Sequence, residues 1–314
     1  MHETREALDA QAQEILKENE GRELKAKDRI QIPVQSMPSQ DPVVRITNMH
    51  EVALGYTEAQ VRAEALRCLQ CKNKPCISGC PVGIDIPAFI AKTAEGKFAE
   101  AAAIIKESSL LPSICGRVCP QESQCQLPCT VGKSLKDVDC SVSIGRIERF
   151  VADWARENNQ EVIPTVAPET GKRVAVVGSG PAGISAAADL RRAGHQVVMF
   201  EALHKAGGVL VYGIPEFRLP KTIVEHELKT LLDMGVEIRR NFLVGKTRTL
   251  KELMEKDGFD AVFVGSGAGL PRFLNIEGEN YVGVFSANEY LTRSNLMKAY
   301  DRDHSRTPIY NSHR

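Results

Sequence analysis

Eight of the nine cysteines fall into two short runs, a density typical of metal binding and redox chemistry. The first run, Cys-x2-Cys-x4-Cys-x3-Cys followed by proline, consists of Cys68, Cys71, Cys76 and Cys80. The second run has x3, x5 and x3 spacings and consists of Cys115, Cys119, Cys125 and Cys129. The first spacing is close to a bacterial pattern in which three thiolates bind one iron–sulfur cluster and the thiolate before proline binds a second. The two runs therefore predict iron–sulfur clusters.

Disulfides and zinc are the two alternatives for these cysteines. Disulfides need an oxidising compartment, but the chain opens with MHETREALDAQ, which is acidic and lacks the apolar segment of an export signal. Zinc sites of four cysteines are common, and Cys-x2-Cys begins many of them. Zinc ribbons usually repeat this spacing, whereas the second run does not. Clusters are the favoured interpretation, and zinc stays open.

Helices are expected to position the cysteines. Residues 57–69 begin with a threonine cap and end at the first cysteine of the first run. Between the runs, residues 86–109 have the apolar periodicity of two helices broken near Gly96. Residues 3–27 predict a short amphipathic helix, and residues 30–42, with three prolines, predict an extended connector. Together these segments predict a helical module of roughly 150 residues.

A second constellation is a glycine fingerprint that follows the predicted strand at residues 173–177. Gly178, Gly180 and Gly183 have GxGxxG spacing and lead into an alanine-rich helix. In such a loop the first glycine permits a tight turn, the second lets the backbone approach a pyrophosphate and the third allows close helix packing. Glu201, at the end of the next predicted strand, is placed to accept the ribose hydroxyls. This acid favours FAD or NAD over NADP at the site.

Further candidates follow the fingerprint. Gly207 and Gly208 have no side chains, so a ligand could approach the backbone closely there, and Arg218 offers a positive charge for a diphosphate. Residues 259–269 predict an apolar strand that ends in a glycine-rich turn, as at the rim of an α/β site. Residues 162–171, with two prolines, predict the linker between this Rossmann-like domain and the helical module.

Length and charge limit the remaining function classes. The chain has 314 residues, enough for about two domains. Its formal net charge is zero and the charges are interspersed, so no basic surface predicts binding to nucleic acid or to an anionic membrane. The apolar stretch at residues 174–188 is broken by glycine and proline and is too short to span a bilayer. We therefore expect a cytoplasmic protein.

Taken together, the motifs resemble the small, beta-type subunit of NADPH-dependent glutamate synthase, including its homotetrameric form. Related proteins are the large subunit of ferredoxin:NADP oxidoreductase and the N-terminal half of dihydropyrimidine dehydrogenase. The motifs that carry the resemblance are RIQIPVQSMPSQDP, CLQCKNKPCISGCPVGIDIPAFI, ICGRVCPQESQC, IGRIERF, VGSGPAG, YGIPEFRLPK and SANEYLTRSNLMKAY.

The resemblance implies an α/β protein with an all-α N-terminal domain. Residues 1–42 would form the N-terminal helix and connector, and residues 43–161 a helical domain with two 4Fe-4S clusters. After the linker at 162–171, residues 172–314 would form an FAD-binding Rossmann-like domain. By motif position, the flavin would contact Gly178, Gly180, Pro181, Ala182, Gly183, Glu201, Gly207, Gly208, Arg218 and Val244.

The resemblance also implies how the metal ligands divide. One cluster would be held by Cys68, Cys71, Cys76 and Cys129. The other would be held by Cys80, Cys119, Cys125 and Glu148. An acid in place of a fourth cysteine should change the potential of the second cluster. Cys115 matches a cysteine that is not a ligand, and Cys140 is the alternative ligand if Glu148 is not one.

The implied activity is an electron-input oxidoreductase subunit. It would pass electrons between NAD(P)H, FAD and the clusters to a flavin-containing synthase subunit, which forms glutamate from glutamine and 2-oxoglutarate, and no residue of this chain would act as a catalytic acid, base or nucleophile. Alternatives are a ferredoxin:NADP or sulfide-type oxidoreductase subunit, with a ferredoxin-type partner, and a non-catalytic electron-transfer fragment. We expect an oligomer.

In the resembled family a second Rossmann domain for NADPH follows the last matched motif. Residues 311–314 do not continue toward another glycine fingerprint. We therefore expect a C-terminally truncated chain, either a fragment or a truncated product.

Overall fold

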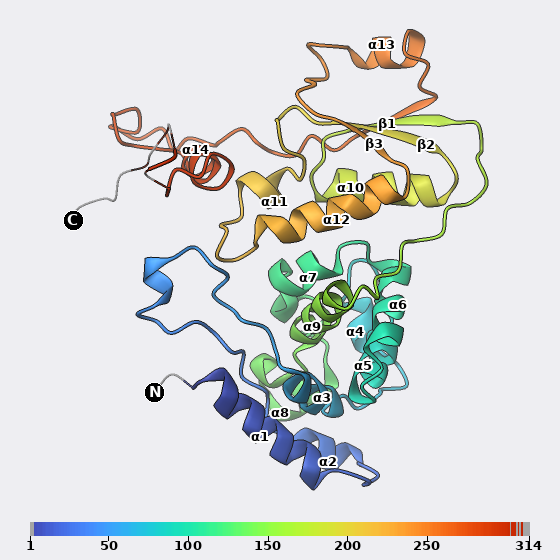
Figure 1. Cartoon of the computed structure of the whole chain (residues 1–314), viewed down its shortest axis with the longest axis vertical. Coiled ribbons are helices and arrows are strands. Elements are labelled where there is room, and N and C mark those ends of the chain that lie inside the picture. The colour runs from blue at the N-terminus through green and yellow to red at the C-terminus, as the bar shows by residue number, and fades with distance from the viewer. Residues whose placement is uncertain (1–2, 302, 306, 308, 310–314) are drawn as a thin grey trace. The chain divides into compact units, whose positions relative to one another are not determined.

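The computed structural model describes residues 3–301, 303–305, 307 and 309, and the chain divides into two compact units (Figure 1). Residues 1–162 form the helical unit and residues 163–314 form the α/β unit. The tail at 311–314 lies outside the described residues. Among the residues described, no helix is long and apolar enough to cross a membrane.

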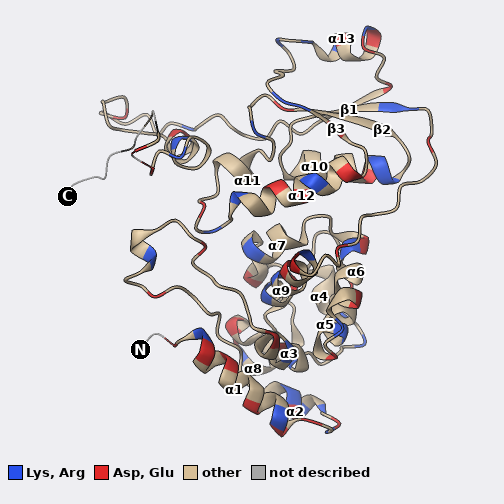
Figure 2. Ribbon diagram, in the orientation of Figure 1, with Lys and Arg blue, Asp and Glu red and all other residues tan. Residues whose placement is uncertain are grey.

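The helical unit is built from short helices joined by irregular segments. Its α-helices are α1 (Arg5–Glu18), α2 (Ala26–Gln31), α3 (Glu58–Leu66), α4 (Pro75–Ser78), α5 (Ile86–Ala94), α6 (Phe98–Ser108), α7 (Pro112–Val118), α8 (Thr130–Leu135) and α9 (Ile144–Glu157). Its 3-10 turns are η1 (Arg45–Thr47), η2 (Gln121–Ser123) and η3 (Val138–Cys140). Acidic and basic residues are interspersed along α1 and α2, so neither helix carries a single sign of charge (Figure 2).

Local sequence signals account for several helix ends. The Thr57 hydroxyl accepts the backbone N–H of Gln60, whose side chain accepts the Thr57 N–H in return, and this capping box starts α3 as predicted. Gly96, with φ of +75°, lies between α5 and α6, where the break was expected. The predicted N-terminal helix is α1, which buries Leu8 and Ala12.

Helix α9 runs through the core of the helical unit. It buries Ile147 and Val151 and packs against α6 and α7. The Phe98 ring of α6 lies 5.1 Å from the Phe150 ring and 5.3 Å from the Trp154 ring, measured between centroids. This packing places the first turns of α9 beside the second cysteine run.

A buried ion pair ties distant segments of the helical unit together. Arg67 Nη1 lies 2.6 Å from Glu64 Oε1, and both side chains are almost completely inaccessible. Arg67 also donates to three backbone carbonyls, those of Ile32, Cys140 and Ser141. Glu64 accepts two backbone N–H groups, those of Gln35 and Ser143. Because its partners satisfy both charges, the pair can lie in the core.

The α/β unit holds a four-stranded parallel sheet with strand order β3-β2-β1-β4. The strands are β1 (Arg173–Val177), β2 (Gln196–Phe200), β3 (Glu237–Arg239) and β4 (Ala261–Val264). The helices are α10 (Pro181–Arg192), α11 (Val209–Tyr212), α12 (Lys221–Asp233), α13 (Leu250–Glu255) and α14 (Ala287–Leu291), followed by the turn η4 (Thr292–Leu296). Helices α10 and α12 cover one face of the sheet, and α13 lies on the other (Figure 1).

Successive side chains of the central strands pack on opposite faces of the sheet, and both faces are covered. Ala175 and Phe200 pack with Leu253 of α13 in one apolar cluster. Neighbouring strand residues such as Val176 and Met199 are also fully buried, so the central strands are covered on both faces. The carboxyl ends of β1 and β2 therefore meet at one edge, where the glycine fingerprint begins.

Candidate functional site

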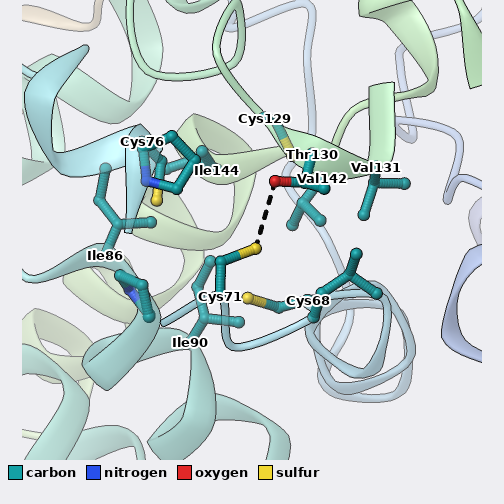
Figure 3. A pocket seen from close by; sticks show the side chains of 13 residues that line it. Cys68, Cys71, Cys76, Ile86, Ile90, Cys129, Thr130, Val131, Val142 and Ile144 are labelled. Atoms are coloured by element: carbon teal, nitrogen blue, oxygen red, sulfur yellow. Dashed lines mark hydrogen bonds between the residues drawn. The ribbon is translucent and has the colours of Figure 1, made fainter. Parts of the chain in front are cut away.

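Four cysteine side chains converge on one pocket in the helical unit (Figure 3). This first group consists of Cys68, Cys71, Cys76 and Cys129. Apart from Thr130, the other described residues that line the pocket are apolar: Leu69, Pro75, Ile86, Pro87, Ile90, Val131, Val142 and Ile144. Three thiols thus come from the first run and one from the second.

Helix ends and turns aim these thiols into the pocket. Cys68 lies just beyond the end of α3. Lys74 adopts a left-handed φ of +41°, which turns the chain before Pro75 starts α4 and brings Cys76 into position. Cys129 is the N-cap residue of α8. The thiols are therefore presented from element boundaries, where the backbone can follow the curvature of a bound group.

Burial raises the pKa of two thiols in the first group, Cys68 and Cys76. The pKa of Cys68 is raised to about 11, chiefly by burial, with the neighbouring Cys129 and Cys71 adding to the increase. The pKa of Cys76 is raised to about 12, again by burial and then by Cys68 and Cys129. A metal ligand must be a thiolate, so binding has to release protons and supply positive charge. A 4Fe-4S cluster meets both needs, because its irons bring the positive charge and bind four thiolates.

The second group consists of Cys80, Cys119, Cys125 and Glu148. Burial raises the pKa of Cys125 to about 12, and the charge of Glu148 is the next cause, followed by Cys80 and Cys119. Glu148 lies on α9 with only 6% of its surface exposed. Glu148, Cys80 and Cys119 thus all lie near enough to Cys125 to raise its pKa, and their binding of one cluster stays a prediction. Three thiols and a buried carboxylate are a donor set that an iron–sulfur cluster can use.

Two glycines allow the backbone approaches that assemble the second group. A Cβ on Gly79, next to Cys80, would lie 2.7 Å from the Gln124 carbonyl oxygen. A Cβ on Gly116 of α7 would lie 2.5 Å from the backbone nitrogen of Arg149, next to Glu148 on α9. Both distances are shorter than real Cβ contacts, so any side chain at these positions would force the segments apart.

The two remaining cysteines have other partners. The Cys115 thiol donates a hydrogen bond to Cys119, which raises the pKa of Cys115 and lowers that of Cys119. The Cys140 thiol donates to Asp137 at 3.5 Å, and this bond is the main reason that the pKa of Cys140 is raised. The charged groups that act on Cys140 are Asp137, Asp139 and Arg67, none of them in the second group.

Neither group is arranged around a single ion. Across the described residues, no set of three or more histidine, cysteine or carboxylate side chains is placed to hold one metal ion. A zinc ion draws four sulfurs to about 2.3 Å, whereas a cluster of four irons holds its thiolates further apart.

In the α/β unit, the fingerprint glycines have the structural roles expected of them. Gly178 has φ of +96°, and a Cβ there would lie 2.4 Å from the Gly265 carbonyl oxygen beyond β4. A Cβ on Gly183 would lie 1.9 Å from the Gly178 carbonyl oxygen, so α10 packs directly on the turn. A Cβ on Gly180 would meet nothing within 4 Å, which leaves open space at the start of α10. This helix start fits a pyrophosphate.

Ser179 links the fingerprint to the two neighbouring loops. Its hydroxyl donates to Glu201 Oε2 and accepts the Gly207 N–H at 2.9 Å. Glu201 also accepts the backbone N–H groups of Ser179 and Leu203. Glu201 therefore lies beside the loop, where these bonds organise the turn. A Cβ on Gly208 would lie 2.7 Å from Gly180 Cα, so the two glycine turns are in backbone contact.

Other predicted flavin contacts lie around this loop or further along the chain. Pro181 and Ala182 form the first turn of α10. Arg218 is exposed, and its N–H donates to the Pro215 carbonyl. Val244 is half-buried against the apolar cluster formed by β1, β2 and α13 with Phe259. Their contact with a flavin stays a prediction.

Sequence reasoning missed three polar residues at these sites. Ser179 lies inside the fingerprint, at a position where the motif specifies no residue type. Thr130 and Gln70 are sequence neighbours of metal-binding candidates, but only the folded chain shows that their side chains reach the sulfurs of Cys71 and Cys68. The one available signal was their adjacency to cysteine.

Comparison with protein-family models divides the chain in the same way. Residues 45–160 match the model described as dihydropyrimidine dehydrogenase domain II, 4Fe-4S cluster. Residues 172–304 match the pyridine nucleotide-disulphide oxidoreductase model. The predicted fold class, an iron–sulfur domain followed by a Rossmann-like domain, is confirmed.

Curated relatives match over most of the chain. The glutamate synthase (NADPH) small chain of Azospirillum brasilense is 35% identical over 268 residues, 85% of this chain and 55% of that protein. Its Bacillus subtilis counterpart is 37% identical over 84% of this chain and 54% of that protein. The NAD-dependent dihydropyrimidine dehydrogenase subunit PreT of Escherichia coli K12 is 38% identical over 72% of this chain and 54% of that protein. The chain thus spans about half the length of these relatives.

Proposed function

The chain belongs to the family that includes the glutamate synthase (NADPH) small chains, and on that premise we propose that it is an electron-input part of an NAD(P)H-dependent oxidoreductase. The single observation that carries the proposal is the division of the cysteines into two groups. Each group draws ligands from both runs, as expected for two clusters sharing one helical unit.

In this proposal the helical unit holds two 4Fe-4S clusters, one in each group. The residues of the first group bind through four thiolates, and Glu148 gives the second group a carboxylate oxygen. Since binding requires thiolates, the raised pKa values of Cys76 and Cys125 make cluster binding release protons. The apolar walls of the first pocket exclude water from the bound sulfurs.

The α/β unit holds FAD at the start of α10. The open space beside Gly180 and the backbone contact between Gly180 and Gly208 support a diphosphate at this point. Glu201 orients the loop through Ser179, and in this proposal it also accepts the ribose hydroxyls. When bound, flavin converts two-electron hydride transfer into the one-electron steps that iron–sulfur clusters carry out.

The whole reaction we propose is oxidation of NAD(P)H, with electrons delivered to a flavin-containing synthase subunit that forms glutamate from glutamine and 2-oxoglutarate. The similarity to PreT favours a second candidate, in which the partner is a dihydropyrimidine dehydrogenase subunit. Steady-state assays with each purified partner, using NAD(P)H as donor, distinguish the two. We also propose a cytoplasmic location, because nine free cysteines suit a reducing compartment.

The cofactor content tests the proposal directly. We expect the anaerobically purified chain to contain about eight irons with matching acid-labile sulfide, as two four-iron clusters require. Flavin released from the same preparation should be FAD. Zinc without sulfide would refute the cluster assignment and leave a zinc-binding scaffold beside a nucleotide-binding domain.

A further inference from the structure

We infer that Thr130 and Gln70 raise the reduction potential of the cluster in the first group by hydrogen bonding to two of its sulfur atoms. This inference rests on the proposed function, because it takes that cluster as given. Thr130 and Gln70 are neighbours of the ligands in sequence, and they would raise the reduction potential of the first cluster only.

Thr130 is the first residue of α8 and follows the ligand Cys129 directly. Its Oγ1 lies 3.3 Å from Cys71 Sγ, and Figure 3 shows the two atoms facing each other across the pocket. In the structure the thiol of Cys71 donates to the hydroxyl. A metal-bound Cys71 has no proton, so the proton shared between the two atoms must then come from Thr130. The hydroxyl becomes a donor to the sulfur.

Gln70 contacts a different sulfur of the same group, that of Cys68. Its backbone has φ of +51°, a left-handed conformation that is uncommon for a residue with a side chain. Its Nε2 donates to the Pro87 carbonyl at 3.0 Å and to Cys68 Sγ at 3.5 Å. One amide hydrogen therefore fixes the side chain, and the second is available to the sulfur.

These donors favour the reduced cluster. Reduction adds one negative charge, and donors to the sulfurs stabilise that charge, the more so in a pocket whose other walls are apolar. The guanidinium of Arg29 adds positive charge nearby, since it donates to the carbonyls of Leu66 and Cys68.

The second group has a different electrostatic environment. It contains the carboxylate of Glu148, and the two neighbouring arginines, Arg117 and Arg149, are paired with Glu51 and Asp153. The paired arginines contribute little net charge. The first cluster therefore has the higher potential of the two.

The test is an anaerobic redox titration of the full chain, followed by electron paramagnetic resonance. Thr130→Val keeps the side-chain shape and removes the donor. It should make the one-electron reduction of the higher-potential cluster about tenfold less favourable, which lowers its midpoint potential by roughly 59 mV. The midpoint potential of the other cluster should not change. Thr130→Ser should restore the wild-type value. Gln70→Asn, which tolerates the left-handed backbone but shortens the reach, should lower the same couple.

Thr93 provides a matched control. It is fully buried in α5, and its hydroxyl donates to the Phe89 carbonyl at 2.9 Å instead of to a sulfur. Thr93→Val should leave both midpoints unchanged. Unchanged midpoints in fully loaded Thr130→Val and Gln70→Asn would overturn the inference, as would an equal shift in Thr93→Val. If Thr130→Val fails to load, Gln70→Asn decides. A wild-type chain without iron and sulfide would refute the proposed function itself.

Discussion

Replacing Gly116 with alanine should remove the second cluster and keep the first. The new Cβ would lie 2.5 Å from the backbone nitrogen of Arg149, about 0.9 Å closer than the 3.4 Å at which ordinary contact begins. Because the opposing atoms are backbone, α7 and α9 have to separate. Overpacking of this kind costs about 1–3 kcal/mol, and the better helix propensity of alanine returns up to about 1 kcal/mol. Separation carries Glu148 away from Cys119 and Cys125.

The assay is iron and sulfide content per chain, measured beside denaturant unfolding of the same preparation. We expect the iron count to fall from about eight toward four, with the remaining spectrum that of the first cluster. Ile105→Val is the matched control, because Ile105 is a buried residue of α6 and its truncation costs a comparable 0.5–1.5 kcal/mol. The control should keep both clusters.

Two results would refute the reasoning. If Gly116→Ala retains about eight irons and an unaltered spectrum, the close approach of α7 and α9 does not assemble the second group. If Ile105→Val loses iron to the same extent, general destabilisation accounts for the loss, and the position of Glu148 does not.

The other predictions concern single groups. Glu148→Ala should alter or remove one cluster signal and spare the other, and an unchanged spectrum would exclude Glu148 as a ligand. Gly208→Ala should weaken FAD binding, measured by flavin fluorescence, because the new Cβ would collide with Gly180. Gly171→Ala is the control: Gly171 also has a positive φ, but a Cβ there meets open space, so FAD binding should not change. Burial raises the pKa of Tyr56 to about 12, so stability should fall as pH rises from about 10 to 12, where the unfolded chain loses a proton that the folded chain keeps. Tyr56→Phe should make this fall in the free energy of unfolding shallower, because Cys68, Cys76 and Cys125 also have raised pKa values, and a slope equal to that of the wild type would argue against the reasoning.

Much of the fold could be predicted because local signals and periodicity agree. The Thr57 cap, the break at Gly96 and the strand, turn and helix around Gly178 each depend on a few neighbouring residues. Their outcome is decided by backbone sterics and by capping, which are readable in sequence. The two compact units meet between residues 162 and 163, and the domain boundaries expected from the sequence remain predictions.

The candidate site was less accessible to residue-level reasoning. Spacing alone could not predict that Cys129 would lie with the first run, or that Cys80 would be grouped with the second. That grouping depends on how the two runs are folded together. The family resemblance supplied that division, and it also supplied Glu148, which otherwise reads as an ordinary helix residue. The donors to the sulfurs depend on distances across the pocket between residues up to 59 positions apart, such as Thr130 and Cys71.

The Glu64–Arg67 pair bears on when cofactors can be delivered during biosynthesis. Arg67 immediately precedes Cys68, yet it bonds to carbonyls 73 and 74 residues further along the chain. A nascent chain cannot complete these bonds until that later segment has left the ribosome, and until then Glu64 also lacks the Ser143 N–H, one of its three partners. We therefore expect a cluster to be inserted only after the chain has been synthesised at least as far as Ser143, into a folded site and not into an emerging peptide.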